Sequence, residues 1–178
     1  VSVYTGEVLH KTNEHQTHGP DDNYWQKEGC GQVWGLLHLR QNLLASCSDD
    51  ATLRVWEVDG MRCLATNYTH GRRARPGTHE KFGRYFAPVW RLVHLGGDAR
   101  LVASCSFDQT VVIWDISDAP DISAVSKFVG HKNSVTNMCL LEPGTLLSCA
   151  GDETCKVWNV ETGHCRRTVA TRGHATCA

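Results

Sequence analysis

Serine, histidine and aspartate occur in this 178-residue chain in a combination that could do nucleophilic chemistry. Ser148, His131 and Asp152 are the residue types of a hydrolytic triad, in which a histidine takes the proton of the serine hydroxyl and a carboxylate orients the histidine. Geometry defines such a triad, because the three residue types alone are common in any chain. The elements that hold these residues therefore decide what they do.

Those elements belong to a repeat. In three segments a serine is followed by an aspartate four residues later and by a tryptophan six residues after that, and a cysteine directly follows each serine. The three sets are Ser46/Asp50/Trp56, Ser104/Asp108/Trp114 and Ser148/Asp152/Trp158. The tryptophans lie 58 and 44 residues apart, and the shorter spacing is typical of repeats in which each unit is one sheet stacked on copies of itself.

Short apolar runs predict four strands in each unit. In the runs before each serine and around each tryptophan, apolar residues occupy both alternating positions, which is typical of strands covered on both faces. Further runs lie upstream and downstream, at 33–39, 89–95 and 135–140 and near 63–68, 124–128 and 165–169. Four such strands make one small antiparallel sheet.

The pattern resembles the WD-repeat β-propeller family. Trp114-Asp115 supplies the dipeptide, Trp56-Glu57 and Trp158-Asn159 are near matches, and Gly130-His131 matches the Gly-His signal. The resemblance implies an all-β fold of blades with four antiparallel strands each, forming part of a larger ring. It also implies a buried hydrogen-bond chain through His131, Ser148, Asp152 and Trp158. The triad-like residues would then have a structural role.

The first two units depart from the family pattern. Their histidines precede the glycine, as His18-Gly19 and His70-Gly71, and a long insertion follows each. We therefore expect the third network to be complete and the first two to lack their histidine.

The repeat predicts a partial propeller over residues 1–178. We assign 1–15 to the end of a preceding unit, 16–68, 69–129 and 130–172 to three full units, and 173–178 to the start of a following one. Insertions at 16–31 and 69–87 are expected on one rim of the central channel. The chain begins without Met inside an expected third strand, so we expect a piece of a longer protein.

Composition is that of an ordinary globular chain, with 18 basic and 19 acidic residues and no apolar run as long as a membrane span. The cysteine count of nine is odd, and no CxxC pair occurs. Cys47, Cys105 and Cys149 share one repeated position, which favours packing as small buried residues over the alternatives of disulfides or metal ligation. Free thiols favour an intracellular setting, cytoplasmic or nuclear.

Other candidates for chemistry are weak. His10, His15 and His18 lie in a polar segment without cysteines or paired carboxylates at metal-site spacing, so we expect solvated loop histidines. His38 and His94 occupy equivalent strand positions. Phosphate-binding glycine loops, HExxH and GxSxG are absent from the sequence. We therefore predict no catalytic residues, no cofactor, no metal and no enzymatic activity.

Aromatic and basic residues are the candidates for partner binding. Trp34 and Trp90 are expected at matching positions on the rim and Phe107 in a rim turn, and packing of the two tryptophan rings between blades is an equally open alternative. The insertion at 69–87 carries five basic residues: Arg72, Arg73, Arg75, Lys81 and Arg84. Arginine suits an acidic or phosphorylated ligand, and a solvated loop is the competing interpretation.

These observations predict a non-catalytic scaffold that recruits protein or peptide partners through its loop rim, as part of a larger regulatory protein. One alternative is binding of an anionic ligand, a phosphorylated peptide or nucleic acid, through the basic insertion, although nucleic acid is the less favoured ligand. Another is an accessory domain of an enzyme whose catalytic domain lies outside this chain. No membrane association is expected.

Overall fold

The computed structural model describes residues 32–68, 70, 87–96 and 100–171, and these form three antiparallel sheets of four strands each. We call them blades 1, 2 and 3. Blade 1 contains β1 (Val33–Arg40), β2 (Leu43–Ser48), β3 (Leu53–Glu57) and β4 (Arg62–Asn67). Blade 2 contains β5 (Val89–His94), β6 (Leu101–Ser106), β7 (Thr110–Asp115) and β8 (Ser123–Val129). Blade 3 contains β9 (Val135–Glu142), β10 (Thr145–Ala150), β11 (Thr154–Asn159) and β12 (Cys165–Ala170).

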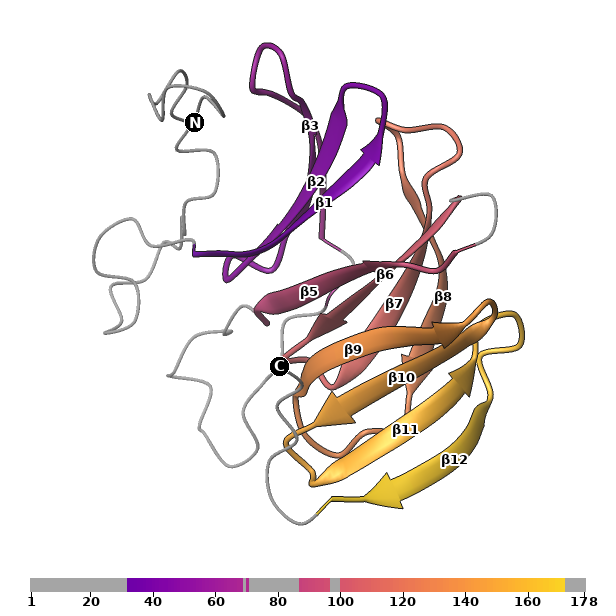
Figure 1. Ribbon diagram of the computed structural model, residues 1–178. Coiled ribbons are helices and arrows are strands. Elements are labelled where there is room, and N and C mark those ends of the chain that lie inside the picture. Colours follow the sequence, from indigo (N-terminus) through magenta and orange to yellow (C-terminus); the bar gives the residue numbers. More distant parts are fainter. Residues whose placement is uncertain (1–31, 69, 71–86, 97–99, 172–178) are drawn as a thin grey trace, which may run out of the picture.

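Strand order within each blade follows the chain, so consecutive strands pair through short turns. The blades fan out from their first strands: β1 contacts β5, and β5 contacts β9, while β4, β8 and β12 lie at the outer edges (Figure 1). The all-β prediction and the four strands per unit are confirmed. Among the described residues no helix is long and apolar enough to span a membrane.

Blades 1 and 2 pack face to face through apolar side chains. The alternation of a strand sends Ala45, Cys47 and Val55 of blade 1 to one face, where they meet Leu92 and Trp114 of blade 2 in one buried cluster. The loop between β7 and β8 adds a polar link between the two blades, because the Arg40 guanidinium of β1 donates a hydrogen bond to the Ala119 carbonyl of that loop at 3.1 Å.

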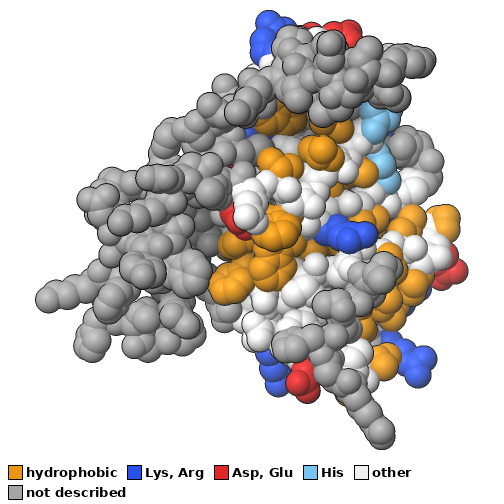
Figure 2. Space-filling model, turned by 60° about the vertical axis from the view of Figure 1, so that its left-hand side comes forward, with side chains coloured by type: hydrophobic (Ala, Val, Ile, Leu, Met, Phe, Trp, Pro, Cys, Tyr) orange, Lys and Arg blue, Asp and Glu red, His pale blue; other side chains and the backbone are white. Residues whose placement is uncertain are grey.

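The opposite face of blade 1 is more open. Leu36 is 63% exposed, whereas the equivalent Leu92 of blade 2 is 7% exposed and Met138 of blade 3 is 2% exposed. Figure 2 shows hydrophobic side chains gathered on one face of the described part, with single basic and histidine side chains between them. Equivalent positions therefore differ in exposure according to whether a described blade covers them.

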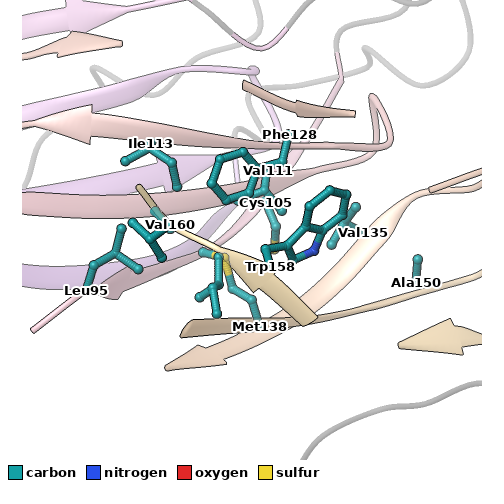
Figure 3. Packing of buried hydrophobic residues seen from close by; sticks show 12 residues of the cluster. Leu95, Cys105, Val111, Ile113, Phe128, Val135, Met138, Ala150, Trp158 and Val160 are labelled. Atoms are coloured by element: carbon teal, nitrogen blue, oxygen red, sulfur yellow. The ribbon is translucent and has the colours of Figure 1, made fainter. Parts of the chain in front are cut away.

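Blades 2 and 3 repeat the same packing. Phe128 of β8 stacks on Trp158 of β11 with ring centroids 5.3 Å apart, and Cys105 and Val111 of blade 2 lie in the same cluster as Met138 (Figure 3). The turn after β11 contributes Gly163, whose φ of +70° favours glycine and whose Cα faces the Phe128 ring. This apolar interface fixes the relative position of the two blades.

Candidate functional site

A hydrogen-bond chain runs through the interior of blade 3. The Trp158 indole N–H donates to the Ser148 hydroxyl at 2.8 Å, and that hydroxyl lies 2.7 Å from His131 Nε2. His131 Nδ1 lies 3.1 Å from the Asp152 carboxylate. The carboxylate also accepts from the Thr154 hydroxyl at 2.7 Å and from the Lys132 backbone N–H at 2.7 Å. Every polar group in this hydrogen-bond chain has a partner, as buried groups require.

Blade 2 contains the same chain. Trp114 Nε1 donates to Ser104 Oγ at 2.7 Å, His70 Nε2 lies 2.6 Å from that oxygen, and His70 Nδ1 lies 3.2 Å from Asp108. The Thr110 hydroxyl donates to Asp108 at 2.6 Å. The expectation that the second unit lacks its histidine is therefore wrong: the imidazole of His70 reaches the serine although its glycine follows it in the sequence.

Blade 1 shows the inner part of this chain. Trp56 Nε1 donates to Ser46 Oγ at 2.7 Å, and the Thr52 hydroxyl donates to Asp50 at 2.6 Å. The buried Arg54 guanidinium adds an ion pair to Asp50 at 3.5 Å. His18, the sequence candidate for this network, lies outside the described residues.

The numbers of donors and acceptors favour a neutral histidine in the hydrogen-bond chains of blades 2 and 3. The serine oxygen accepts from the indole N–H, so its own hydrogen is free to point to Nε2 of the imidazole. Nε2 is then the acceptor, and the Nδ1–H donates to the aspartate. In agreement with this, burial lowers the pKa of His131 below its ordinary value of 6.5, against the opposing effect of Asp152.

The aspartates of these two hydrogen-bond chains, Asp152 and Asp108, are held ionised. Burial acts to raise the pKa of Asp152, but hydrogen bonds from the Lys132 N–H, the Thr154 hydroxyl and His131 outweigh it and hold this pKa at about 2. For Asp108, burial is again opposed, here by hydrogen bonds from His70 and Thr110 and by the Lys127 ammonium at 3.3 Å, and its pKa lies well below its usual range.

The triad-like geometry does not expose a nucleophile. Ser148 and Ser104 are both 0% exposed, and each hydroxyl already accepts from a tryptophan. A substrate carbonyl cannot reach either oxygen without opening the blade, so the arrangement serves to tie the strands of each sheet together. The prediction of no catalytic residue remains a prediction for the whole chain.

A second set of residues lies where each innermost strand begins. The pairing register shifts between Val33 and Gly35 in β1 and between Val89 and Arg91 in β5, so Trp34 and Trp90 are β-bulge residues. The same shift in β9 leaves Thr136 as the bulge residue of blade 3. A bulge leaves its extra residue outside the ladder and re-aims the side chain.

The bulges lie beside the turns after the second strands. One backbone bond recurs there in all three blades, from the turn to the residue just before the innermost strand: Asp49 N to Gln32 O, Phe107 N to Pro88 O and Gly151 N to Ser134 O. We call the bulge residues and these turn residues the rim: Trp34 and Asp49, Trp90 and Phe107, Thr136 and Gly151.

The rim carries a tryptophan in blades 1 and 2, whereas its residues in blade 3 are the small Thr136 and Gly151. Trp34 is 51% exposed and donates its indole N–H to Asp49. Trp90 contacts Phe107 edge to face, with centroids 6.0 Å apart, and Phe107 is 40% exposed. Trp34 therefore presents its ring to solvent. Trp90 is only partly buried, and it packs against a rim residue of its own blade.

The other sequence candidates fall into two groups. Arg72, Arg73, Arg75, Lys81, Arg84 and the loop histidines His10, His15 and His18 lie outside the described residues. His94 Nε2 donates to the His38 carbonyl at 2.7 Å and so joins blades 2 and 1, while its Nδ1 is buried and has no hydrogen-bond partner. Within the described ranges, no group of three His, Cys, Asp or Glu residues could hold a metal ion.

Sequence reasoning missed the serines Ser48 and Ser106. Both are 0% exposed, and their hydroxyls accept the backbone N–H of Asp50 and Asp108, which shapes the turn that leads to each aspartate. Each lies two residues after the serine of the repeat, and this equal spacing is visible in the sequence. The bulges were also missed, because an extra residue in one strand leaves no mark in a single sequence.

These sheets define a β-propeller assembled from four-stranded blades with a buried Ser–His–Asp–Trp chain. The family model described as "WD domain, G-beta repeat" matches residues 26–57, 83–115 and 122–159, which is more than half of the chain. The chain therefore belongs to the WD40 repeat family.

Fungal relatives match most of this chain. Nuclear distribution protein PAC1 of Komagataella phaffii is 29% identical over 133 residues, 71% of this chain and 25% of its own length. Nuclear distribution protein nudF of Aspergillus niger is 28% identical over 132 residues, 73% of this chain and 26% of its own length. The chain thus spans about a quarter of the length of these relatives.

Two solved structures share the fold. The WD40 β-propeller domain of Doa1 superposes with a TM-score of 0.59 at 22% identity, covering 79% of this chain and 41% of that one. The structure of U3-55K gives a TM-score of 0.62 at 20% identity, covering 81% and 41%.

Proposed function

We propose that this chain is a non-catalytic interaction scaffold that recruits protein or peptide partners through the rim. The observation that carries the proposal is the pair of bulges, which set Trp34 outside the ladder beside Asp49 and Trp90 outside the ladder beside Phe107. Membership of a repeat family whose blades serve as scaffolds supports it.

The energetics of recognition favour this surface. Tryptophan is among the residues that contribute most to protein interfaces, because a large flat ring buries much apolar area while few rotatable bonds are fixed. Here the rings stand on strands whose positions are set by two buried interfaces, so little further order is lost on binding. Asp49 beside Trp34 adds an acceptor for a donor group of the partner.

The alternatives predicted from the sequence remain proposals. The basic insertion could bind an acidic or phosphorylated ligand, and the chain could serve as the accessory domain of an enzyme. The described part of the rim contains exposed aromatic rings, which favour the peptide hypothesis over one based on charge alone.

The test is a capture experiment with the full-length protein. One variant carries Trp34→Ala, Trp90→Ala and Phe107→Ala, and its matched control carries Val125→Ala and Leu141→Ala, two apolar residues that are each 54% exposed away from the rim. A third variant reverses the charge of Arg72, Arg73 and Arg75 to Glu. Folding of all three is checked by thermal unfolding.

Partners lost from the aromatic variant and kept by its control would support the rim. An unchanged partner set in a folded aromatic variant would overturn the proposal. Loss from the arginine variant alone, together with wild-type capture that falls steeply as salt is raised, would replace it with the anionic-ligand alternative.

A further inference from the structure

Blade 3 holds two cysteines face to face. Cys149 of β10 and Cys155 of β11 are direct partners in the antiparallel register, and their sulfur atoms lie 2.7 Å apart. Directly opposite residues of such a pair have Cα atoms about 4.5–5.5 Å apart. This separation falls within the range of about 4.4–6.8 Å that a disulfide spans. Neither residue forms a disulfide in this structure.

The equivalent positions of the other blades lack such a pair. Cys47 of blade 1 faces Leu53, and Cys105 of blade 2 faces Val111. Both cysteines are 0% exposed, and burial raises the pKa of Cys47 to about 12 and that of Cys105 still further. A thiol that stays protonated in an apolar interface is a poor nucleophile, so these two are packing residues.

Cys155 lies on the face of blade 3 that no described blade covers, whereas the equivalent Leu53 and Val111 are buried against the following blade. It is only partly buried, and its neighbour across the next strand pair is Val169, which is 43% exposed, where blade 2 has the buried Phe128. Cys149 behind it is 1% exposed. Within the described part of the chain, Cys155 is therefore the more exposed of two thiols in contact, and it is the one that a peroxide would reach first.

We propose that Cys149 and Cys155 are a reversible oxidation site that forms a cross-strand disulfide with a hydroperoxide. The thiolate of Cys155 attacks the peroxide, the O–O bond breaks, and Cys155 becomes a sulfenic acid while the leaving oxygen takes up a proton. The sulfur of Cys149 then attacks the sulfur of Cys155 and displaces its hydroxyl as water. With hydrogen peroxide, two thiols and one peroxide give one disulfide and two waters, a two-electron oxidation.

The disulfide would join the two ends of the turn that carries Asp152, the carboxylate of the buried hydrogen-bond chain in blade 3. Residues 150–154 between the two cysteines include the rim residue Gly151 and also Asp152, which accepts from Thr154 and Lys132. Oxidation would fix both ends of this turn covalently. The equivalent turns of blades 1 and 2 lack the second cysteine and would not respond.

The test is peptide mapping of the full-length protein after treatment with hydrogen peroxide and alkylation with iodoacetamide. Trypsin releases residues 133–156, a peptide that contains Cys139, Cys149 and Cys155. We expect one alkylated cysteine, Cys139, and a Cys149–Cys155 bridge seen as the loss of two hydrogens. Dithiothreitol should restore all three alkylation sites.

Two variants make the result specific. Cys155→Val installs the residue that blade 2 carries at this register, and it should abolish the bridge while the protein stays folded. Cys139→Ser should leave the bridge intact. Three alkylated cysteines after peroxide, a bridge through Cys139, or irreversible sulfinic acid at Cys155 with alkylated Cys149 would each overturn the proposal.

Discussion

Blades 2 and 3 contain the same buried chain but reach it by different routes along the sequence. His70 precedes Trp114 by 44 residues, and His131 precedes Trp158 by 27. Nevertheless the imidazole Nε2 lies 2.6 Å from the serine in blade 2 and 2.7 Å in blade 3. The sheet fixes where the histidine must stand, whereas the number of residues between the histidine and the tryptophan differs, because lengthening a connection between strands costs little free energy.

The first prediction concerns the tryptophans that donate into the hydrogen-bond chains of blades 2 and 3. Trp114→Ala and Trp158→Ala should each lower the free energy of unfolding by about 3–5 kcal/mol, because each deletes a buried ring and leaves a cavity. Urea denaturation measures the loss. Trp34→Ala, at the exposed rim, should change it by less than about 0.5 kcal/mol. If Trp158→Ala were as mild as Trp34→Ala, the two blades would not be equivalent.

The second prediction concerns the histidines. His70→Leu and His131→Leu should destabilise the protein by similar amounts, about 1–3 kcal/mol each, since each leaves a serine hydroxyl and an aspartate short of a partner. Thermal and chemical unfolding of both variants would show this, with the exposed His164→Leu as control. A loss confined to His131→Leu would restore the expectation that only the third network is complete.

Much of this comparison was accessible from the sequence. The Ser–Asp–Trp spacing predicted three repeated units, because the serine, the aspartate and the tryptophan occupy fixed positions on one strand, in the turn after it and on the next strand. The histidine of blade 2 was not predicted, since the motif was read as a contiguous Gly-His pair, whereas only the position of the imidazole matters. The bulges depend on pairing between strands, and the Cys149–Cys155 contact depends on register across a turn.

The third prediction is a loss of stability in acid through blade 3. Burial lowers the pKa of His131 below 6.5 in the folded protein, so below that pH the unfolded chain takes up a proton that the folded protein does not. Stability should therefore fall as the pH drops through this range. A second fall should begin near pH 3.8, where unfolded aspartates protonate while Asp152 stays ionised down to about 2.

Urea midpoints across this pH range would show both steps. His131→Leu should flatten the upper step and leave the lower one, and Asp152→Asn should reduce the lower step. An upper step that persists unchanged in His131→Leu would assign the dependence to other groups.

The smallest effect is expected where the same donor sits at the surface. In blade 1 the indole N–H of Trp56 donates to buried Ser46 at 2.7 Å, and that of Trp34 donates to Asp49 at the rim. Trp56→Phe should cost about 1–3 kcal/mol, because it removes the donor to a buried hydroxyl. Trp34→Phe should cost under about 0.5 kcal/mol, because water replaces the lost bond.

The rim bond should instead be visible in the titration of Asp49. Burial raises the pKa of this carboxyl, and the Trp34 N–H opposes the rise. Trp34→Phe should therefore raise the pKa of Asp49 further, which NMR titration of the carboxyl would detect, with Trp90→Phe as the control. A large loss of stability in Trp34→Phe with no change at Asp49 would make this rim residue part of the scaffold, and the distinction between buried chain and exposed rim would fail in blade 1.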